Sequence, residues 1–308
     1  MVYKLDKLDN KIIDELSVDS RRSLEKIAKT LKISKQMLNY RLKNLYKKKI
    51  ITQFTTWVDS SVFGSSLGFG LYIKLDHIPT DFIEKIKKIK NIHTIVESSG
   101  SYDLYISIFC DNSITAKNLI EKIKNLAKGH ITKLSSFCHA GYRYKYLNIK
   151  QRTISPERIK LLDAKDIIIL KELMKNSRIS LKELGKKIDL NFKTVGIRIR
   201  KLELNKIIRR YTINFDHSKI YDHIYSIMIK DVNVNDEKIK ELFKRTESFE
   251  FVSTNSFVNA LVVSFSSNNK ETVHRLHRII SEMFPEATDV QSSIIIRFIK
   301  RDWSGLLE

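Results

Sequence analysis

Residues 20–34 read SRRSLEKIAKTLKIS, and residues 177–191, which lie 157 positions later, read SRISLKELGKKIDLN. The same offset aligns the flanking sequence without a gap, so that residues 5–59 correspond to residues 162–216. About a third of these positions are identical. Because chance similarity rarely keeps apolar spacing in register over such a length, we interpret the chain as a tandem duplication.

Each copy has the periodicity of three helices. In the first copy, apolar residues recur at helical spacing from Leu8 to Leu16 and predict one buried face of a first helix. Ser23 is placed to cap a second helix, and a short turn separates that helix from Ser34, a second N-cap candidate. A third helix then follows, with Leu38 among its inward residues. This pattern is typical of a helix-turn-helix.

The third helix of each copy has a polar and basic outer face, which in a helix-turn-helix enters the major groove of double-stranded DNA. We expect the DNA-binding residues of the first copy to be Ser34, Lys35, Gln36, Asn39, Tyr40 and Lys43. In the second copy we expect them to be Lys193, Thr194, Gly196, Arg200 and Lys201. Gln36 and Asn39 are suited to read base edges, whereas Arg41 and Arg198 are expected to be structural or to contact phosphates.

The sequence after each helical unit predicts an α/β domain. Residues 51–59 alternate as a strand that forms a wing or a connection. The segments 69–76, 80–90, 93–99, 102–109, 114–127 and 130–147 then give the order βαββαβ, which is ferredoxin-like, and the second copy repeats it. The expected fold class is α+β, with two winged helix-turn-helix domains, each followed by a ferredoxin-like domain. The expected domain bounds are 1–60, 61–147, 148–217 including a linker, and 218–308.

Composition restricts the class of function. The net charge is +21, and residues 1–60, 61–150 and 151–218 carry +7, +6 and +9, whereas residues 219–308 carry −1. A local basic excess favours a phosphate backbone as partner. The sequence has no run of about 18 apolar residues, so we expect no membrane span and a cytoplasmic protein. Cys110 and Cys138 are too few for a zinc module, and His274 with His277 lacks a third ligand, so we expect no metal and no cofactor.

A winged helix-turn-helix followed directly by a βαββαβ domain resembles the Lrp/AsnC family of prokaryotic regulators. The resemblance rests on LDKLDNKIIDEL at residues 5–16, ISKQMLNYRLKNL at residues 33–45 and the turn Gly100-Ser101-Tyr102-Asp103. It implies an effector site for a small molecule such as an amino acid at Gly100, Ser101 and Asp103, and a homo-oligomeric assembly.

The sequence departs from the family pattern in three respects. Family members normally carry one copy, whereas this chain carries two. The glycine common after the third helix is Lys49 in the first copy and Lys206 in the second. In the second copy the effector turn becomes residues 256–259, SFVN, without glycine or carboxylate. The second α/β domain is therefore expected to complete an interface rather than to bind an effector.

The function that these features favour is sequence-specific transcription regulation, without enzymatic activity. We expect the two α/β domains to pair as a pseudo-dimer within one chain and the unlike third helices to prefer an asymmetric site. Three alternatives remain: an enzyme resembling siroheme decarboxylases, which should show several histidines and arginines converging on one pocket, a non-specific chromatin-like DNA-binding protein, and an effector sensor without DNA binding. The basic excess in both helical regions disfavours the sensor.

Overall fold

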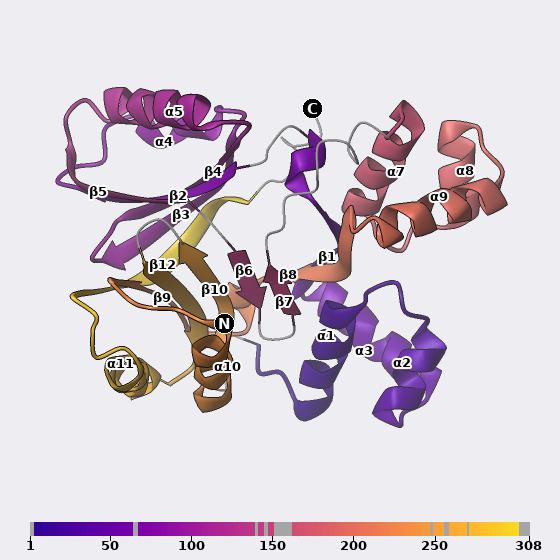
Figure 1. Ribbon diagram of the computed structural model, residues 1–308. Coiled ribbons are helices and arrows are strands. Elements are labelled where there is room, and N and C mark those ends of the chain that lie inside the picture. The colour runs from indigo at the N-terminus through magenta and orange to yellow at the C-terminus, as the bar shows by residue number, and fades with distance from the viewer. Residues whose placement is uncertain are drawn as a thin grey trace. The chain divides into compact units, whose positions relative to one another are not determined.

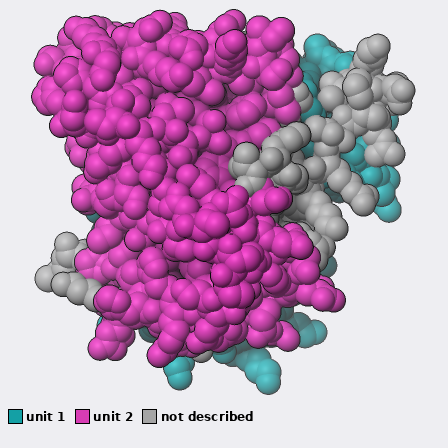
Figure 2. Space-filling view, turned by 60° about the vertical axis from the view of Figure 1, so that its left-hand side comes forward, with its two compact units in different colours: residues 1–62, 153–220 teal, residues 63–152, 221–308 magenta. Residues whose placement is uncertain are grey.

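The computed structural model describes residues 3–63, 67–138, 141–144, 147–150, 162–246, 249–255, 259–269 and 271–301. The chain forms two compact units, and each unit combines parts from both copies. Unit 1 comprises residues 1–62 and 153–220, and unit 2 comprises residues 63–152 and 221–308 (Figure 2). Unit 1 thus holds the helical segments of both copies, and unit 2 holds the α/β segments of both copies.

Unit 1 contains the two predicted three-helix elements (Figure 1). The first copy forms α1 (Lys7–Val18), α2 (Leu24–Leu31), α3 (Lys35–Lys47) and β1 (Ile51–Val58), and ends at the short 3₁₀ helix η1 (Ser60–Phe63). The second forms α7 (Ala164–Lys175), α8 (Leu181–Ile188), α9 (Phe192–Leu204), β8 (Ile208–Phe215) and η2 (His217–Lys219). Helices α1 and α7 begin with an aspartate capping box, at Asp6 and Asp163, and both second helices begin at a serine cap, as expected from the preference of these residues for N-caps.

The strand after each helix-turn-helix joins the two copies. β1 pairs with β8 in an antiparallel two-stranded sheet in which Thr55 lies opposite Thr212, its own counterpart in the duplication. The two copies are therefore related by an approximate two-fold axis at this pair. The sequence left open whether residues 51–59 form a wing or a connection; here the strand both follows its helix-turn-helix and pairs with the other copy.

Unit 2 contains the two ferredoxin-like domains, which confirms the predicted fold class. The first is built from β2 (Leu67–Leu75), α4 (Phe82–Lys87), β3 (Ile92–Gly100), β4 (Leu104–Cys110), α5 (Ser113–Leu126) and β5 (Ile131–Cys138). The second is built from β9 (His223–Lys230), α10 (Asp236–Arg245), β10 (Phe249–Asn255), β11 (Ala260–Ser267), α11 (Glu271–Met283) and β12 (Asp289–Arg301). The strand orders are β5-β2-β4-β3 and β12-β9-β11-β10, which is the same order in both copies.

The two ferredoxin-like domains pair within the chain. β12 pairs with β9 of its own domain and also with β3 of the other domain, so the strands form one continuous sheet. The sheets also meet through an apolar layer that combines Tyr72, Tyr102 and Phe137 with Met228, Ala260 and Val262. Both contacts, the β3–β12 pairing and the apolar layer, join the two domains within one chain.

One predicted strand differs from the structure. Residues 130–147 were expected to form a single strand, but β5 ends at Cys138 and two short strands follow, β6 (Gly141–Tyr144) and β7 (Leu147–Lys150). β5 pairs with β2, whereas β6 pairs with β10 of the second domain. This part of the first copy thus pairs with strands of both domains, as β12 does in the second copy. Most of the predicted linker, residues 151–161, lies outside the described residues.

Candidate nucleic-acid interface

The turn between the second and third helices has the same backbone geometry in both copies. Lys32 and Asp189 end α2 and α8 in the left-handed conformation, with φ of 55° and 50°. The next residue closes the turn, since the N–H of Ile33 donates to the carbonyl of Ala28 and the N–H of Leu190 donates to that of Gly185, each at 3.0 Å. The third helices then begin at N-caps, where the Ser34 hydroxyl accepts from Met37 N–H and the Asn191 side chain accepts from Lys193 N–H. These contacts set the direction in which α3 and α9 leave the turn.

The predicted DNA-binding residues of the first copy lie together on the outer face of α3 and at its cap. All of them are exposed, and the list comprises Ser34, Lys35, Gln36, Asn39, Tyr40 and Lys43. Leu38, Leu42 and Leu45 are buried on the opposite face, which fixes the rotation of the helix. Lys35 forms an ion pair with Glu25 of α2, and Tyr40 is 63% exposed. The outer face of α3 is therefore polar, with one aromatic residue at its centre.

The predicted residues of the second copy also gather on one face, that of α9. Lys193, Thr194, Arg200 and Lys201 are exposed, and Gly196 is partly exposed. Two apolar residues of the same helix are also exposed but were not predicted as binding residues, Phe192 (43% exposed) and Ile197 (70% exposed). The exposure of Ile197 could be predicted from the sequence. Ile197 occupies the position of Tyr40 in the first copy, and neither residue fits the periodicity of the buried residues.

Arg41 and Arg198 anchor the third helices to the first helices. The Arg41 guanidinium pairs with Asp6 and, at 3.1 Å, with the buried Asp9. Arg198 pairs with Asp163 at 2.8 Å and with the buried Asp166 at 2.9 Å.

This network also affects the titration of the capping aspartates. The backbone N–H of Asp9, together with Arg41, holds the pKa of Asp6 below its usual value. The backbone N–H of Asp166, together with Arg198, does the same for the pKa of Asp163. The two arginines thus join the third helix to the N-cap of the first helix in each copy, which is a structural role.

The two helix-turn-helix elements meet at a symmetric polar joint within unit 1. The hydroxyls of Ser20 and Ser177, which occupy equivalent positions, lie 2.6 Å apart and are fully buried. Their N–H groups donate to the carbonyls of Tyr211 and Phe54, each at 3.2 Å. Arg21 donates to the carbonyl of Ser177 at 2.7 Å, and the equivalent arginine of the second copy donates to a carbonyl of the first at 3.0 Å. Together with the β1–β8 pairing, this joint holds α3 and α9 at a defined separation.

The predicted effector residues lie at the junction of the two ferredoxin-like domains. Gly100 has φ of +125°, and a Cβ atom there would lie 2.6 Å from the carbonyl oxygen of Ser292 in β12. The N–H of Ser101 donates to that same oxygen at 3.0 Å. The Asp103 carboxylate accepts from Lys74 Nζ at 2.7 Å and from the N–H of Leu75 at 2.8 Å. The turn therefore has structural partners, and its binding of an effector stays a prediction.

The second copy differs at the equivalent turn. Residues 256–258 lie outside the described residues, and Asn259, with φ of 43°, accepts at its carbonyl from the N–H of Val232.

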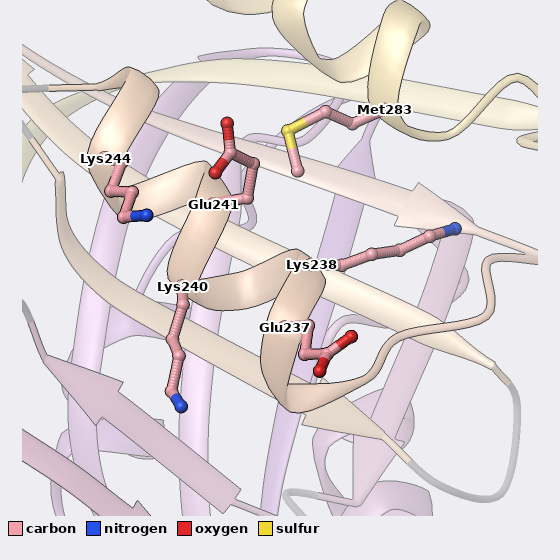
Figure 3. Close-up of a pocket in the computed structure, with 6 residues that line it drawn as sticks. All are labelled: Glu237, Lys238, Lys240, Glu241, Lys244 and Met283. Atoms are coloured by element: carbon pink, nitrogen blue, oxygen red, sulfur yellow. The ribbon is translucent and has the colours of Figure 1, made fainter.

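A surface hollow of about 560 Å³ lies along α10, away from this turn. It is lined by Glu237, Lys238, Lys240, Glu241, Lys244 and Met283 (Figure 3). The charged side chains are of mixed sign and point in different directions rather than toward a common point (Figure 3). Lys238 is already paired with Glu286 at 3.1 Å. The hollow therefore offers no convergent set of groups for a small ligand.

Within the described ranges, no three histidine, cysteine or acidic side chains are grouped so that they could hold a metal ion. A search of the same residues finds no helix with the length and apolar character needed to cross a membrane.

Two helix-turn-helix elements with exposed third helices, followed by ferredoxin-like domains, define a tandem regulator-type architecture. The AsnC-type helix-turn-helix domain matches the chain twice, at residues 5–45 and 162–203. The HTH-type transcriptional regulator Ptr1 of Methanocaldococcus jannaschii is 36% identical over 129 residues, which cover 39% of this chain and 82% of that protein. The regulator LrpC of Bacillus subtilis is 37% identical over 91 residues, 29% of this chain and 63% of LrpC. The chain belongs to the Lrp/AsnC family of helix-turn-helix transcription regulators.

Among solved structures, the siroheme decarboxylase NirDL matches over 98% of this chain and 96% of its own, with a TM-score of 0.65 and 11% sequence identity. This match shows that the whole tandem arrangement occurs in another protein of known structure. At such low identity it is a similarity of fold alone.

Proposed function

We propose that this protein is a sequence-specific double-stranded DNA-binding transcription regulator whose helices α3 and α9 read two different half-sites. The observation that carries the proposal is the exposure of both third helices on two paired helix-turn-helix elements in a chain of the Lrp/AsnC family. Exposed polar and basic residues at such positions are the groups that contact base edges and phosphates in the major groove.

The difference between the two outer faces supports an asymmetric target. Gln36, Asn39, Tyr40 and Lys43 of α3 stand at the positions of Lys193, Gly196, Ile197 and Arg200 in α9. Gln and Asn pair bidentately with adenine, Lys and Arg pair with guanine, and an apolar side chain contacts the thymine methyl group. We therefore expect one half-site to be read mainly through adenines and the other through guanines and thymine methyl groups.

The joint between the two copies supports binding of both half-sites by one chain. Because Ser20, Ser177 and the β1–β8 pairing connect the two elements inside one polypeptide, binding of one third helix places the other close to the duplex. A fixed separation of the reading helices also corresponds to a fixed spacing of the half-sites.

The proposal includes modulation by a small molecule such as an amino acid, and assembly of the chain into a homo-oligomer. The position of Gly100, Ser101 and Asp103 at the contact between β3 and β12 supports the first part, since a ligand bound there would act on the pairing of the two domains. Purified protein titrated with the twenty amino acids should show a shift in thermal unfolding for at least one of them. If none of the twenty amino acids shifted the unfolding temperature, amino acids would be excluded as effectors.

The main experiment is selection of fragmented genomic DNA by the purified protein at about 150 mM salt with excess competitor DNA, a salt level at which phosphate contacts alone are weakened. We expect a small set of intergenic sites that share one motif with two unlike halves. A palindromic motif would contradict the asymmetric reading. Uniform recovery of all fragments would instead indicate a chromatin-like DNA-binding protein, and no recovery would remove DNA binding altogether.

A second candidate function is siroheme decarboxylation, favoured by the match to NirDL over almost the whole chain. We rank it second because the relatives of similar sequence are transcriptional regulators. Addition of an iron tetrapyrrole to the purified protein separates the two candidates. A sharp shift in the absorption of the tetrapyrrole with one equivalent bound per chain would support the enzyme, and an unchanged spectrum would exclude it.

A further inference from the structure

The helical layers of the two ferredoxin-like domains differ in charge. In the first domain, the segments 81–90 and 113–128, which contain α4 and α5, hold eight lysines and three acidic residues, a net charge of +5. In the second domain, the segments 236–245 and 271–286, which contain α10 and α11, hold six basic and six acidic residues, a net charge of zero. The two segment pairs have the same total length, so the difference is one of composition and not of size.

The lysines of the first domain are held on one side of it by the packing of the helices. α4 and α5 contact each other and lie on one face of the sheet formed by β2 to β5 (Figure 1). Phe82, Ile86, Leu119 and Ile123 are buried against this sheet. Because the apolar face of each helix points inward, the lysines are directed to solvent. We call the exposed lysines of these two segments the lysine face; they are Lys85, Lys88, Lys90, Lys117, Lys122, Lys124 and Lys128.

Most of the lysine face is not neutralised by neighbouring carboxylates. Within the lysine face, Lys124 pairs with Glu121 at 2.8 Å. Lys87, which is partly buried and does not belong to the face, pairs with Glu84 at 3.0 Å. Within the described part of the chain, the other six lysines of the face make no ion pair. Like charges collected on one surface repel each other, so such a surface is stabilised by an anionic partner.

A general enrichment of lysine in the protein does not account for this surface. The second ferredoxin-like domain belongs to the same chain and has the same fold, yet its helical layer is neutral. There six acidic residues equal the six basic residues in number, and two of the cations form the Lys238–Glu286 and Arg245–Glu282 pairs. The excess is therefore a property of one domain.

We propose that the lysine face is a second, sequence-independent binding site for the phosphate backbone of double-stranded DNA. This inference rests on the proposed function, since its partner is likewise double-stranded DNA. Lysine ammonium groups bind phosphates as point charges without reading bases. DNA is favoured over an anionic membrane because binding in a membrane interface requires a row of exposed apolar residues. Ile114 is the one exposed large apolar side chain in the two described segments.

The test compares three variants of the full chain in the salt dependence of binding to duplexes with and without the selected motif. The face variant carries Lys85→Gln, Lys88→Gln, Lys117→Gln and Lys122→Gln. The matched control carries Lys240→Gln, Lys244→Gln, Arg275→Gln and Arg278→Gln, which removes four exposed cations from the other helical layer. The head variant carries Lys35→Ala, Lys43→Ala, Lys193→Ala and Arg200→Ala. Exposed substitutions of this kind are expected to leave folding intact.

Each phosphate contact contributes about 0.9 to the slope of log K against log salt. We expect the face variant to lose about three to four units of the slope of log K against log salt, and the control to keep the wild-type slope. The head variant should lose its preference for the motif while retaining weak salt-dependent binding. Equal slopes for the wild type and the face variant would overturn the inference but not the proposed function. Loss of phosphatidylserine vesicle binding with unchanged DNA binding would overturn it in favour of a membrane. Absence of any DNA binding by the wild type would overturn both proposals.

Discussion

In the first helix-turn-helix, Arg41 joins the third helix to two aspartates at the start of the first helix, and Arg198 makes the same connection in the second. On the outer faces of the same two helices, Tyr40 stands where Ile197 stands, and Gln36 where Lys193 stands. The inner contacts are kept because each copy must fold and pair. The outer residues contribute little to folding, so they are free to differ. The inner contacts therefore maintain the scaffold, whereas the outer residues are those that we propose to read the target.

The largest expected effect comes from breaking the contact that keeps the two copies paired in unit 2. Gly100→Ala places a Cβ atom against the Ser292 carbonyl at a φ that L-residues rarely adopt, and we expect a loss of about 3 kcal/mol in the free energy of unfolding. Gly129→Ala is the control, since Gly129 also has positive φ but no neighbouring atom within 4 Å, and it should lose about 1 kcal/mol. Urea unfolding of the full chain measures both. Equal losses would show that the contact with β12 contributes nothing.

The next effect tests whether the inner contacts of the two copies are equivalent. Arg41→Ala and Arg198→Ala each leave a buried aspartate without its cation, at Asp9 and Asp166. We expect each variant to lose about 2 kcal/mol of stability, less than for a fully buried pair because both arginines are partly exposed. Thermal unfolding of the two variants should give similar midpoints. A large difference between them would show that the two copies do not depend equally on this network.

A smaller effect tests the difference between the outer faces. Gln36→Ala should weaken binding to the selected site by about tenfold and make it insensitive to base changes in one half-site only. Lys193→Ala should do the same for the other half-site. Competition binding with duplexes altered in one half-site at a time measures this. If either substitution affected both halves equally, the idea of two distinct reading helices would be wrong.

The smallest effect concerns pH. The pKa values of Asp6 and Asp163 are lowered in the folded protein, first by backbone N–H groups and then by the paired arginines. A lowered folded pKa contributes stability above the unfolded value of about 4, and that stability is lost as the pH falls through the folded value. Asp6→Asn and Asp163→Asn keep an N-cap side chain but remove the charge. Each should reduce, to a similar extent, the fall in unfolding midpoint between about pH 5 and pH 3. An unchanged pH profile in both variants would contradict this assignment.

The elements that the sequence predicted well are those determined by local signals. The starts of α2, α3 and α9 follow from caps at Ser23, Ser34 and Asn191, and the exposed faces of α3 and α9 follow from the spacing of buried residues such as Leu38 and Val195. The left-handed residues Lys49 and Lys206, with φ of 54° and 57°, occupy the position after the third helix where glycine is common in the family.

The features that the sequence did not predict depend on partners far along the chain. Residues 141–144 pair with β10 of the second domain, and no pattern within residues 130–147 specifies that partner. The close contact of Gly100 with Ser292 likewise appears only when β12 is placed beside β3. The helical spacing places Ile197 on the outer face of α9, but its apolar side chain was not predicted to take part in binding.

The pairing of β1 with β8 inside one polypeptide has a genetic consequence. In a dimer of identical chains, every substitution in a recognition helix appears twice, so a change of target must alter both half-sites together. Here a codon change in α3 leaves α9 untouched, because the two helices are encoded separately. If the two helices read separate half-sites, as we propose, a binding site can change one half at a time while the other half preserves part of the affinity at every step. The duplication therefore allows a gradual route between regulatory targets.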